Sequence, residues 1–488
     1  MSQEERAQQK GIMSRRQRSL TIVVAIIAIT GTTLFAQETN APPAGTVDEK
    51  IERLDEEIQS LKRQRELDQE QVQQQANQSA QTAKQTTIVT AGPEGFAFKS
   101  ADDSFELRIR GYAQADGRFY FNDKSNLGTD TFLMRRVRPI LEGTVARDFD
   151  FRIMPDFGNG STVLEDAYVE WHYWPWAKIR AGKAKVPVGL EWLQQDTWTA
   201  FAERGLPSDL VPQRDVGVQL SGDLFGGVFS YAVGVYNGVV DGGIADVDTS
   251  DSKDGVAHIF IQPFRTTDID PLKGLGFGAG ASIGDEQSSS TTTNLASYKT
   301  VGQNTFFSFG KGVAPDGLEY RLSPQGYYYW GPVGLLSEYV IADQDLKNGA
   351  YRHYMRNSAW QTDASFVLTG EDASYNGVTP RHPFDLRSGG WGAFEIAARY
   401  GDLHLDPSAF NTSPAAAGAR FASPITAAQE AREWGVGLNW YLNRNIKFVL
   451  DYDVTYFDGG AGTASASAYT VKDRRTEQVG IGRVQFMF

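Results

Sequence analysis

The chain has 488 residues, contains no cysteine and carries a formal net charge of −13. The absence of cysteine excludes disulfides and thiolate metal sites, and the acidic balance argues against a general nucleic-acid binder. With 50 Gly, 20 Tyr, 28 Phe and 10 Trp, the composition favours many strands and turns over packed helices.

Residues 13–37 read MSRRQRSLTIVVAIIAITGTTLFAQ, with a basic start, an apolar run from Leu20 to Ile29 and small residues leading to Ala36. This order is typical of a secretory signal peptide, which we expect over residues 1–36. An inner-membrane anchor is the alternative, but the apolar run is short for a membrane span.

Residues 37–92 are expected to form a periplasmic coiled-coil segment followed by a Gln-rich linker. Apolar residues recur at alternating spacings of four and three, namely Val47, Ile51, Leu54, Ile58 and Leu61. This spacing predicts a short coiled-coil helix, with a solvated single helix as the alternative. Residues 69–92 are dominated by Gln, Ala and Thr and offer nothing to bury, so we expect them to act as a tether.

From residue 96 onward, apolar and polar residues alternate over a dozen positions or more. Examples are FELRIRGYAQADGRFYF (105–121) and IKFVLDYDVTYF (446–457). A soluble sandwich strand needs only about five or six residues to bury its apolar face. Longer alternating strands are typical of an outer-membrane barrel, which is tilted across the bilayer with lipid outside and water inside.

The connections between these segments alternate between tight turns and long polar loops. Aromatic residues, which mark a membrane interface, flank tight turns at 174–176, 225–228, 330–333 and 441–446. Counting the connections gives sixteen strands, the first near 104–121 and the last near 473–488. We therefore predict an all-β fold, a sixteen-stranded antiparallel transmembrane β-barrel over residues 96–488 with both ends on the periplasmic side. The last strand ends in Phe488, which resembles the C-terminal signal of bacterial outer-membrane proteins.

The stretch DTFLMRRVRPILEGTV (130–145) places three arginines in a segment that otherwise suits burial. If Val137 faces lipid, Arg136 and Arg138 face the lumen. An arginine on the lipid side would cost about 2–4 kcal/mol at mid-depth. Arg135 has the outward parity, so we predict that it lies at the rim or on a β-bulge. The alternative role for these arginines is only to solvate the interior by pairing with carboxylates.

Fixed charges dominate selectivity where a barrel narrows. Residues 104–214 hold 15 basic and 15 acidic side chains, whereas residues 215–488 hold 20 basic and 30 acidic ones. The segment WAKIRAGKAKVPVG (176–189) adds only basic charges, and the long third loop follows it. We expect this loop to fold inward, because structureless loops longer than about 12–15 residues are usually functional. The candidate anion-binding residues of the pore constriction are Arg135, Arg136, Arg138, Arg180, Lys183, Lys185, Arg204 and Arg214.

Several motifs occur in the order found in the phosphate-selective porin family of the O and P type. They include RRVRPILEG, LEDAYVEW, GKAKVPVGLE, FAERGL and PQRDVGVQLSGDLFGG. The chain resembles that family over about residues 96–488, which implies a trimeric sixteen-stranded outer-membrane channel with basic residues along the passage. The resemblance assigns the family's paired arginines to Arg135 and Arg136, the GxxKxP lysine to Lys185, and the arginine after the loop glutamate to Arg204.

We therefore expect an outer-membrane channel for passive diffusion of small anions, with phosphate or a related oxyanion as the solute. Two alternatives stay open: a broad-specificity porin for small polar solutes, and a structural tether whose coiled coil contacts the cell wall or a periplasmic partner. No motif places a nucleophile beside a base, and the five histidines share no ligand-like spacing, so we expect no enzymatic activity, cofactor or metal. The expected partners are small anions, outer-membrane lipid and further copies of the chain in a homotrimer.

Overall fold

The computed structural model describes residues 46–85, 87–121, 128–244, 251–287, 295–411, 420–465 and 469–488. The predicted signal peptide at 1–36 lies outside these residues. The chain divides into two units, Met1–Ala80 and Gln81–Phe488. Within the described part, no helix combines the length and the apolar character that crossing a membrane requires.

Helix α2 (Val47–Gln85) contains the predicted coiled-coil seam. The five seam residues are between 46% and 75% exposed, so an apolar stripe runs along the helix surface. Its association with a partner stays a prediction. The helix continues to Gln85, so residues 69–85 are helical, and their role as a tether stays a prediction. Gln and Ala have high helix propensity, which favours continuation of the helix even where little surface is buried.

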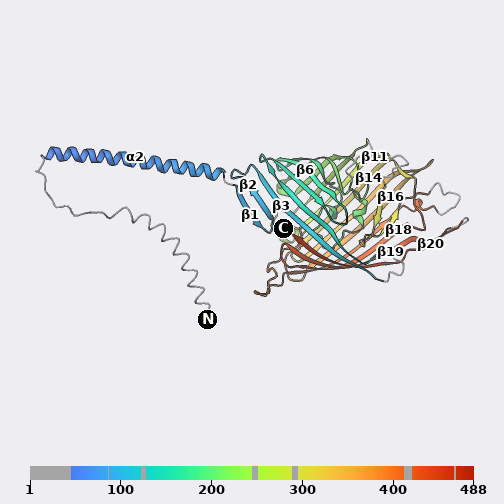
Figure 1. Cartoon of the computed structure of the whole chain (residues 1–488). Helices are drawn as coiled ribbons and strands as arrows, with labels where there is room; N and C mark the ends of the chain where they lie inside the picture. Colours follow the sequence, from blue (N-terminus) through green and yellow to red (C-terminus); the bar gives the residue numbers. More distant parts are fainter. Residues whose placement is uncertain are drawn as a thin grey trace. The chain divides into compact units, whose positions relative to one another are not determined.

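Sixteen antiparallel strands form a closed barrel in the second unit (Figure 1), which confirms the predicted fold class. In chain order they are β3 (Glu106–Tyr120), β4 (Thr131–Val145), β5 (Phe149–Asp156), β6 (Val163–Trp174), β7 (Ala177–Lys185), β8 (Arg214–Leu224), β9 (Phe229–Tyr236), β10 (Asp254–Ile261), β11 (Leu275–Gln287), β14 (Val313–Trp330), β15 (Val333–Asn348), β16 (Tyr351–Val367), β17 (Ala393–His404), β18 (Ala428–Tyr441), β19 (Ile446–Ala464) and β21 (Glu477–Met487). Each strand pairs with the next, and β21 closes the barrel on β3, with Arg483 opposite Asp116.

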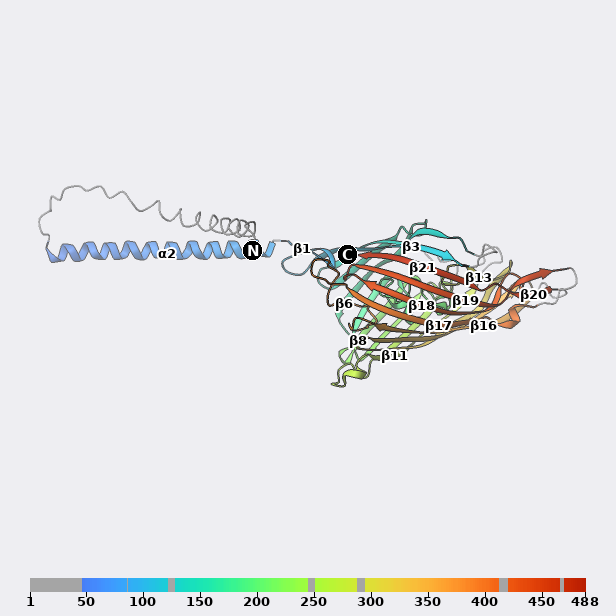
Figure 2. The ribbon, with the colours of Figure 1, turned by 90° about the horizontal axis from the view of Figure 1, so that it is seen from below.

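Shorter elements precede β3 or lie in the connections between the barrel strands. They are β1 (Ile88–Gly92), β2 (Gly95–Lys99), β12 (Ser297–Lys299), β13 (Thr305–Ser308), β20 (Tyr469–Asp473), α3 (Leu190–Leu193), η1 (Leu206–Leu210), η2 (Phe225–Gly227), η3 (Asp270–Leu272) and η4 (Pro407–Ala409). The β1–β2 hairpin pairs with the start of β3, and β20 pairs with the end of β19. Figure 2 shows β1 and β20 at opposite ends of the barrel.

The predicted alternation along β3 places polar residues inside and apolar residues outside. Gln114, Asp116 and Arg118 are buried on the lumen side, while Phe119 is exposed on the outer wall. The same parity continues in β4, where Arg136 and Arg138 are buried. A bilayer offers no hydrogen bonds to a strand, so a closed ladder with an apolar outer face is the arrangement that a spanning sheet requires.

The C-terminal residue is held by the first strand of the barrel. The Phe488 N–H donates to the Gly111 oxygen at 3.0 Å, and the Gly111 N–H donates to the Phe488 oxygen at 3.1 Å. The Phe488 ring contacts Phe96 of β2 edge to face, with ring centroids 6.3 Å apart. Gly95 has a φ of +90° and leaves 2.4 Å between an added Cβ and the Ile109 oxygen, so this hairpin requires glycine.

Three connections contribute residues to the interior. At the end of the barrel where β3 ends, the third connection along the chain joins β7 to β8 (186–213) and is called the third loop. The connection that contains β12 and β13 packs Tyr298, Phe306 and Phe307 against this loop in a buried apolar cluster. At the other end of the barrel, residues 368–392 join β16 to β17. The Tyr375 hydroxyl of this segment donates to the Leu190 oxygen of the third loop at 2.6 Å.

Candidate functional site

The third loop lies inside the barrel and bonds to strands far from its own in the sequence. The Leu190 N–H donates to Glu338 of β15 at 2.8 Å, and the Ala202 N–H donates to Asp451 of β19 at 2.6 Å. Lys447 Nζ donates to the Thr199 oxygen at 2.8 Å. Because these strands lie across the lumen from β7 and β8, the loop spans the interior.

Glu191 fixes the path of this loop. One of its oxygens accepts hydrogen bonds from the Gly205 N–H at 3.0 Å and from Gln361 Nε2 at 2.7 Å, and the other pairs with Arg399 at 2.5 Å. The loop's apolar side chains, including Val188, Leu206 and Leu210, join the buried cluster. The polar contacts therefore set the position of the loop, and the apolar packing stabilises it.

Asp196 lies at the centre of a first group of basic side chains. It accepts hydrogen bonds from Arg204 at 2.5 Å, Arg138 at 2.6 Å and the Tyr112 hydroxyl at 2.8 Å. Burial alone would raise the pKa of Asp196, but Arg204, Arg136 and Arg138 outweigh it and hold this pKa well below its usual range. The carboxylate is therefore charged at neutral pH.

Glu203 forms a second group with four arginines. Arg135 donates to both of its oxygens, at 2.6 and 3.1 Å, and Arg118 and Arg483 lie at 2.7 and 3.1 Å. Burial raises the pKa of Glu203, but Arg135, Arg136 and the other arginines hold it well below its usual range. These contacts place Arg135 in the lumen despite its outward parity.

A β-bulge explains the position of Arg135. The register pairs Gln114 with Arg136 and then Ala115 with Met134, so Arg135 is the extra residue. A bulge turns an outward side chain away from its expected direction. The expected bulge or rim position of Arg135 is thus found in the strand register.

Four of the eight predicted residues line one cavity of about 420 Å³, bounded by the third loop and by residues 240–244 and 295–303. They are Arg135, Arg136, Arg138 and Arg204. Among these, Arg136 has the longest ion pairs, 3.6 Å to Asp196 and 3.5 Å to Glu203. Its Nε atom is buried and has no hydrogen-bond partner in the described part of the chain.

Two more predicted residues lie next to this cavity without lining it. Lys185 Nζ donates to the Trp192 and Gln194 oxygens, each at 2.7 Å. Arg214 pairs with Glu165 at 2.6 Å and Asp166 at 2.8 Å. Both cations lie over the Trp192 ring, as does Arg204, whose Cζ is 4.7 Å from the ring centroid. Trp192 therefore holds three cations beside the loop.

The remaining two predicted residues are not brought to the cavity. Arg180 pairs with Glu170 at 2.7 Å and stacks on Tyr168, farther along β7. Lys183 is buried on β7 and does not line the cavity. Of the basic residues of β7, only Lys185 therefore lies next to the cavity.

Sequence reasoning missed Arg118 and Arg483, which complete the Glu203 group. Both have the lumen parity of their alternating strands, so that parity was an available signal. It also missed residues 368–392, whose length was the only sign of an inward fold. Gln194 Nε2 donates to the Tyr375 oxygen of this segment at 2.7 Å.

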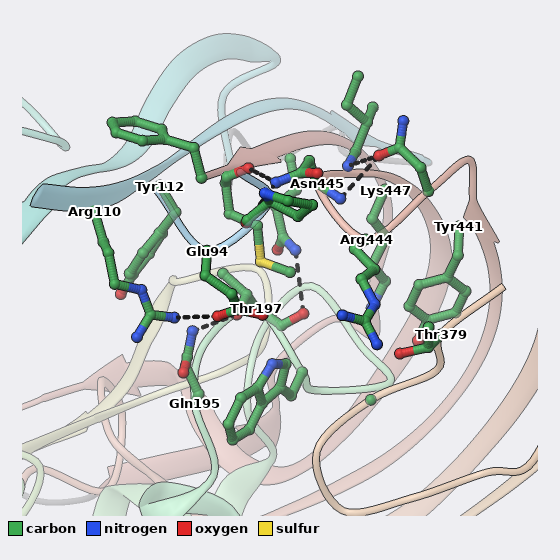
Figure 3. A pocket seen from close by; sticks show the side chains of 18 of the residues that line it. Glu94, Arg110, Tyr112, Gln195, Thr197, Thr379, Tyr441, Arg444, Asn445 and Lys447 are labelled. Atoms are coloured by element: carbon green, nitrogen blue, oxygen red, sulfur yellow. Dashed lines mark hydrogen bonds and ion pairs between the residues drawn. The ribbon is translucent and has the colours of Figure 1, made fainter. Parts of the chain in front are cut away.

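A second cavity of about 230 Å³ lies on the other side of the third loop (Figure 3). Its lining includes the basic residues Arg110, Arg444 and Lys447, with Gln195 and Thr197 from the loop. Asp196 instead lines the first cavity. Successive loop residues therefore separate the two cavities.

Ion pairs link nine arginines and eight carboxylates in one continuous network among the described residues. The arginines are Arg110, Arg118, Arg135, Arg136, Arg138, Arg152, Arg204, Arg214 and Arg483, and the carboxylates are Glu94, Asp116, Glu142, Asp156, Glu165, Asp166, Asp196 and Glu203. Lys185 lies beside this network and is bonded to backbone oxygens. The network therefore has a small excess of positive charge.

The opposite wall of the lumen is acidic. Its carboxylates on β15 to β19 are the buried Glu338, Glu395, Glu433, Asp451 and Asp453 and the half-buried Asp363, and its basic residues are Arg399 and Lys447. Arg399 joins this wall to the loop, at 2.9 Å from Asp363 and 2.5 Å from Glu191. The acid surplus of the second half of the sequence thus lies partly inside the barrel.

Solved structures of other porins share low sequence identity with the chain. The outer-membrane channel DcaP of Acinetobacter baumannii is 12% identical, with a TM-score of 0.49, over 82% of this chain and all of that one. OmpT of Vibrio cholerae is 10% identical, with a TM-score of 0.48, over 79% and 98%. The anion-selective porin from Comamonas acidovorans is 10% identical, with a TM-score of 0.46, over 79% and 100%. A comparison with curated proteins gives no match.

A family match covers nearly all of the barrel. Residues 105–487 match the family described as phosphate-selective porin O and P. This segment begins just before β3 and ends with β21, so it includes every strand of the barrel wall. Its family and its barrel make the protein an outer-membrane channel. The chain belongs to the phosphate-selective porin O and P family.

Proposed function

We propose that the protein is a passive channel for small anions, with phosphate and related oxyanions as its solutes, and that the third loop forms the constriction. The observation that carries the proposal is the arginine-lined first cavity, where Arg135, Arg136, Arg138 and Arg204 converge on the loop. Catalysis and a cofactor are not part of this function.

The incompletely paired cations supply the attraction for an anion. Arg136 keeps its carboxylate partners at 3.5 Å or more, and Lys185 is held by backbone oxygens. A guanidinium can bind two oxygens of a phosphate at once, whereas a lysine acts as a point charge. An entering oxyanion would therefore compete with Asp196 and Glu203 for the same guanidinium groups.

A broad-specificity porin for small polar solutes is the second candidate. The near balance of nine arginines against eight carboxylates favours it, as does the acidic wall on β15 to β19. In that case the arginines stabilise the loop and the lumen, and the channel discriminates weakly between ions of opposite sign.

We also propose a homotrimer in the outer membrane, with helix α2 in the periplasm. The family resemblance supports the trimer, and an even number of strands places both ends of the barrel segment on one side of the membrane. The exposed apolar stripe of α2 would then be available to a copy of the helix or to a periplasmic partner, as in the tether hypothesis.

The test is inhibition of the chloride current by phosphate in single channels in a planar bilayer. Phosphate should block the parent channel at low concentration, and Arg136→Gln should raise the half-blocking concentration by roughly tenfold, the cost of about 1.4 kcal/mol. Arg265→Gln is the matched control, because Arg265 is exposed in the connection between β10 and β11 and bonds only locally, to Gln262. Equal block in all three channels would contradict the proposal.

A further inference from the structure

Three potential metal ligands meet on the outer face of the barrel, away from the lumen site. Asp402 and His404 share the outward parity of Tyr400 on β17, and Glu430 lies on the adjacent strand β18. The register pairs His404 directly with Glu430 and places Asp402 one step away on the same face. The residues are distant in sequence, so ligand spacing along the chain could not reveal them.

The cluster lies just beyond the aromatic part of the outer wall. Tyr400 pairs with Trp434 in the register, and its ring centroid is 5.6 Å from that of Trp360. Aromatic residues of a barrel lie at the boundary between hydrocarbon and the polar region. Asp402 and His404 follow Tyr400 toward the loop at 405–427, so they lie where charged ligands and a metal ion are accessible to water.

The ligand atoms have a spacing that suits one metal ion. They all lie within 4.8 Å of one another, and His404 Nδ1 is 3.3 Å from Glu430 Oε2. Tetrahedral ligands at zinc distances of about 2.0–2.1 Å are roughly 3.3–3.4 Å apart. The His404–Glu430 pair already has this separation, and a rotation of the Asp402 side chain would bring in the third ligand.

The hydrogen bonding leaves these atoms available. Arg432 Nε pairs with Glu430 Oε1 at 2.6 Å, which leaves Oε2 directed to His404. Asp402 is opposite Arg432 in the register, yet its Oδ1 atom is buried and has no hydrogen-bond partner among the described residues. Asp458, exposed opposite Glu430, adds a further negative charge on this face. A buried carboxylate oxygen without a partner is costly, and a cation would remove that cost.

We propose that Asp402, His404 and Glu430 bind one divalent transition-metal cation of the zinc class on the outer wall. An imidazole with two carboxylates suits Zn²⁺ or a similar ion, whereas Mg²⁺ and Ca²⁺ prefer oxygen ligands alone. Three protein ligands leave a fourth position open to water or to a ligand from the surface. The site is independent of the passage of anions through the lumen.

The experiment is a Zn²⁺ titration of the purified, chelator-treated full chain in detergent against a chromophoric chelator. The parent should bind one equivalent of Zn²⁺. His404→Ala and Asp402→Asn should each weaken Zn²⁺ binding by at least roughly tenfold, because changing residues that only support metal ligands already weakens binding by about that factor. His172→Ala is the matched control, because His172 Nδ1 has a similar pair with Asp150 at 3.2 Å but belongs to no such three-ligand group among the described residues. It should bind like the parent.

Three results would overturn the proposal. They are the absence of saturable Zn²⁺ binding by the parent, equal affinity in His404→Ala, and displacement of Zn²⁺ by equimolar Mg²⁺. Retained heat-modifiable migration on a denaturing gel shows that each variant is folded, so a loss of binding reports on the ligands.

Discussion

Acidification from pH 8.5 to 5.5 is expected to strengthen the anion preference of the channel, through Asp209 of the third loop. Asp209 lines the first cavity. Burial raises its pKa to about 7, against the smaller effect of the Lys299 N–H, which donates to it at 2.8 Å. Because the pKa is raised, the side chain is charged above pH 7 and neutral below it. At pH 8.5 about thirty copies are charged for each neutral one, and at pH 5.5 the ratio is reversed.

The magnitude follows from the loss of one negative charge beside the cavity. The electrostatic interaction energy between a unit charge and a monovalent ion 4 Å away is about 4 kcal/mol at an effective dielectric near 20. At twice that distance it is about half as large. Salt in an open cavity screens part of this energy, so we expect the anion-to-cation permeability ratio to rise by roughly three- to tenfold.

The assay is the reversal potential in a fixed KCl gradient at each pH. Asp209→Asn should show a smaller change in the permeability ratio between the two pH values than the parent, because its side chain cannot be charged. Asp268→Asn, in the connection between β10 and β11, should titrate like the parent. A parent ratio that is constant with pH, or an unchanged titration in Asp209→Asn, would refute the role of Asp209.

Two further predictions concern the barrel and its assembly. Protein purified in detergent should migrate faster on a denaturing gel before boiling than after it, because the closed ladder from β3 to β21 leaves no free edge; identical migration with helix-dominated circular dichroism would contradict the barrel in solution. Native mass spectrometry should show trimers that persist when residues 46–85 are deleted, because a barrel-sized interface should outweigh one short apolar seam; dimers, or loss of oligomers on deletion, would contradict the trimer proposal.

The wall of the barrel was predictable because its pattern is local. Alternation alone assigns Gln114 and Arg118 to the lumen and Phe119 to lipid, and the structure agrees. The same rule shows that Arg135 breaks the parity, and the cost of an arginine in lipid then requires a bulge or a rim position. The register confirms the bulge.

The pairing of the site residues was not predictable, since it depends on contacts across the lumen. Nothing local indicates that Glu203 is shared by Arg135 and Arg483, which are far apart in the sequence. The basic run of β7 suggested a row of pore charges, but Arg180 pairs with Glu170 on the adjacent strand. Strand neighbours therefore decide which basic residues stay available to a solute.

The helix and the inward segments show a second limit of the sequence. The Gln-rich composition after residue 69 predicted a tether, and the high helix propensity of Gln and Ala lets α2 continue to Gln85. Residues 368–392 have no internal pattern that indicates burial. Their inward fold depends on the third loop, to which Tyr375 bonds.

The central claim is that incompletely paired cations at the third loop make the channel anion-selective. The most direct test is the reversal potential of the parent, of Arg136→Gln with Lys185→Gln, and of the control Arg265→Gln with Lys273→Gln. Substitution by Gln rather than Glu removes the positive charges without adding a carboxylate beside Asp196. The control variant removes two basic side chains from the exposed connection between β10 and β11, where Lys273 pairs with Asp270. We predict anion preference in the parent and control and its loss in the loop variant. A parent without anion preference, or equal reversal potentials in all three channels, would contradict the claim and favour a broad porin.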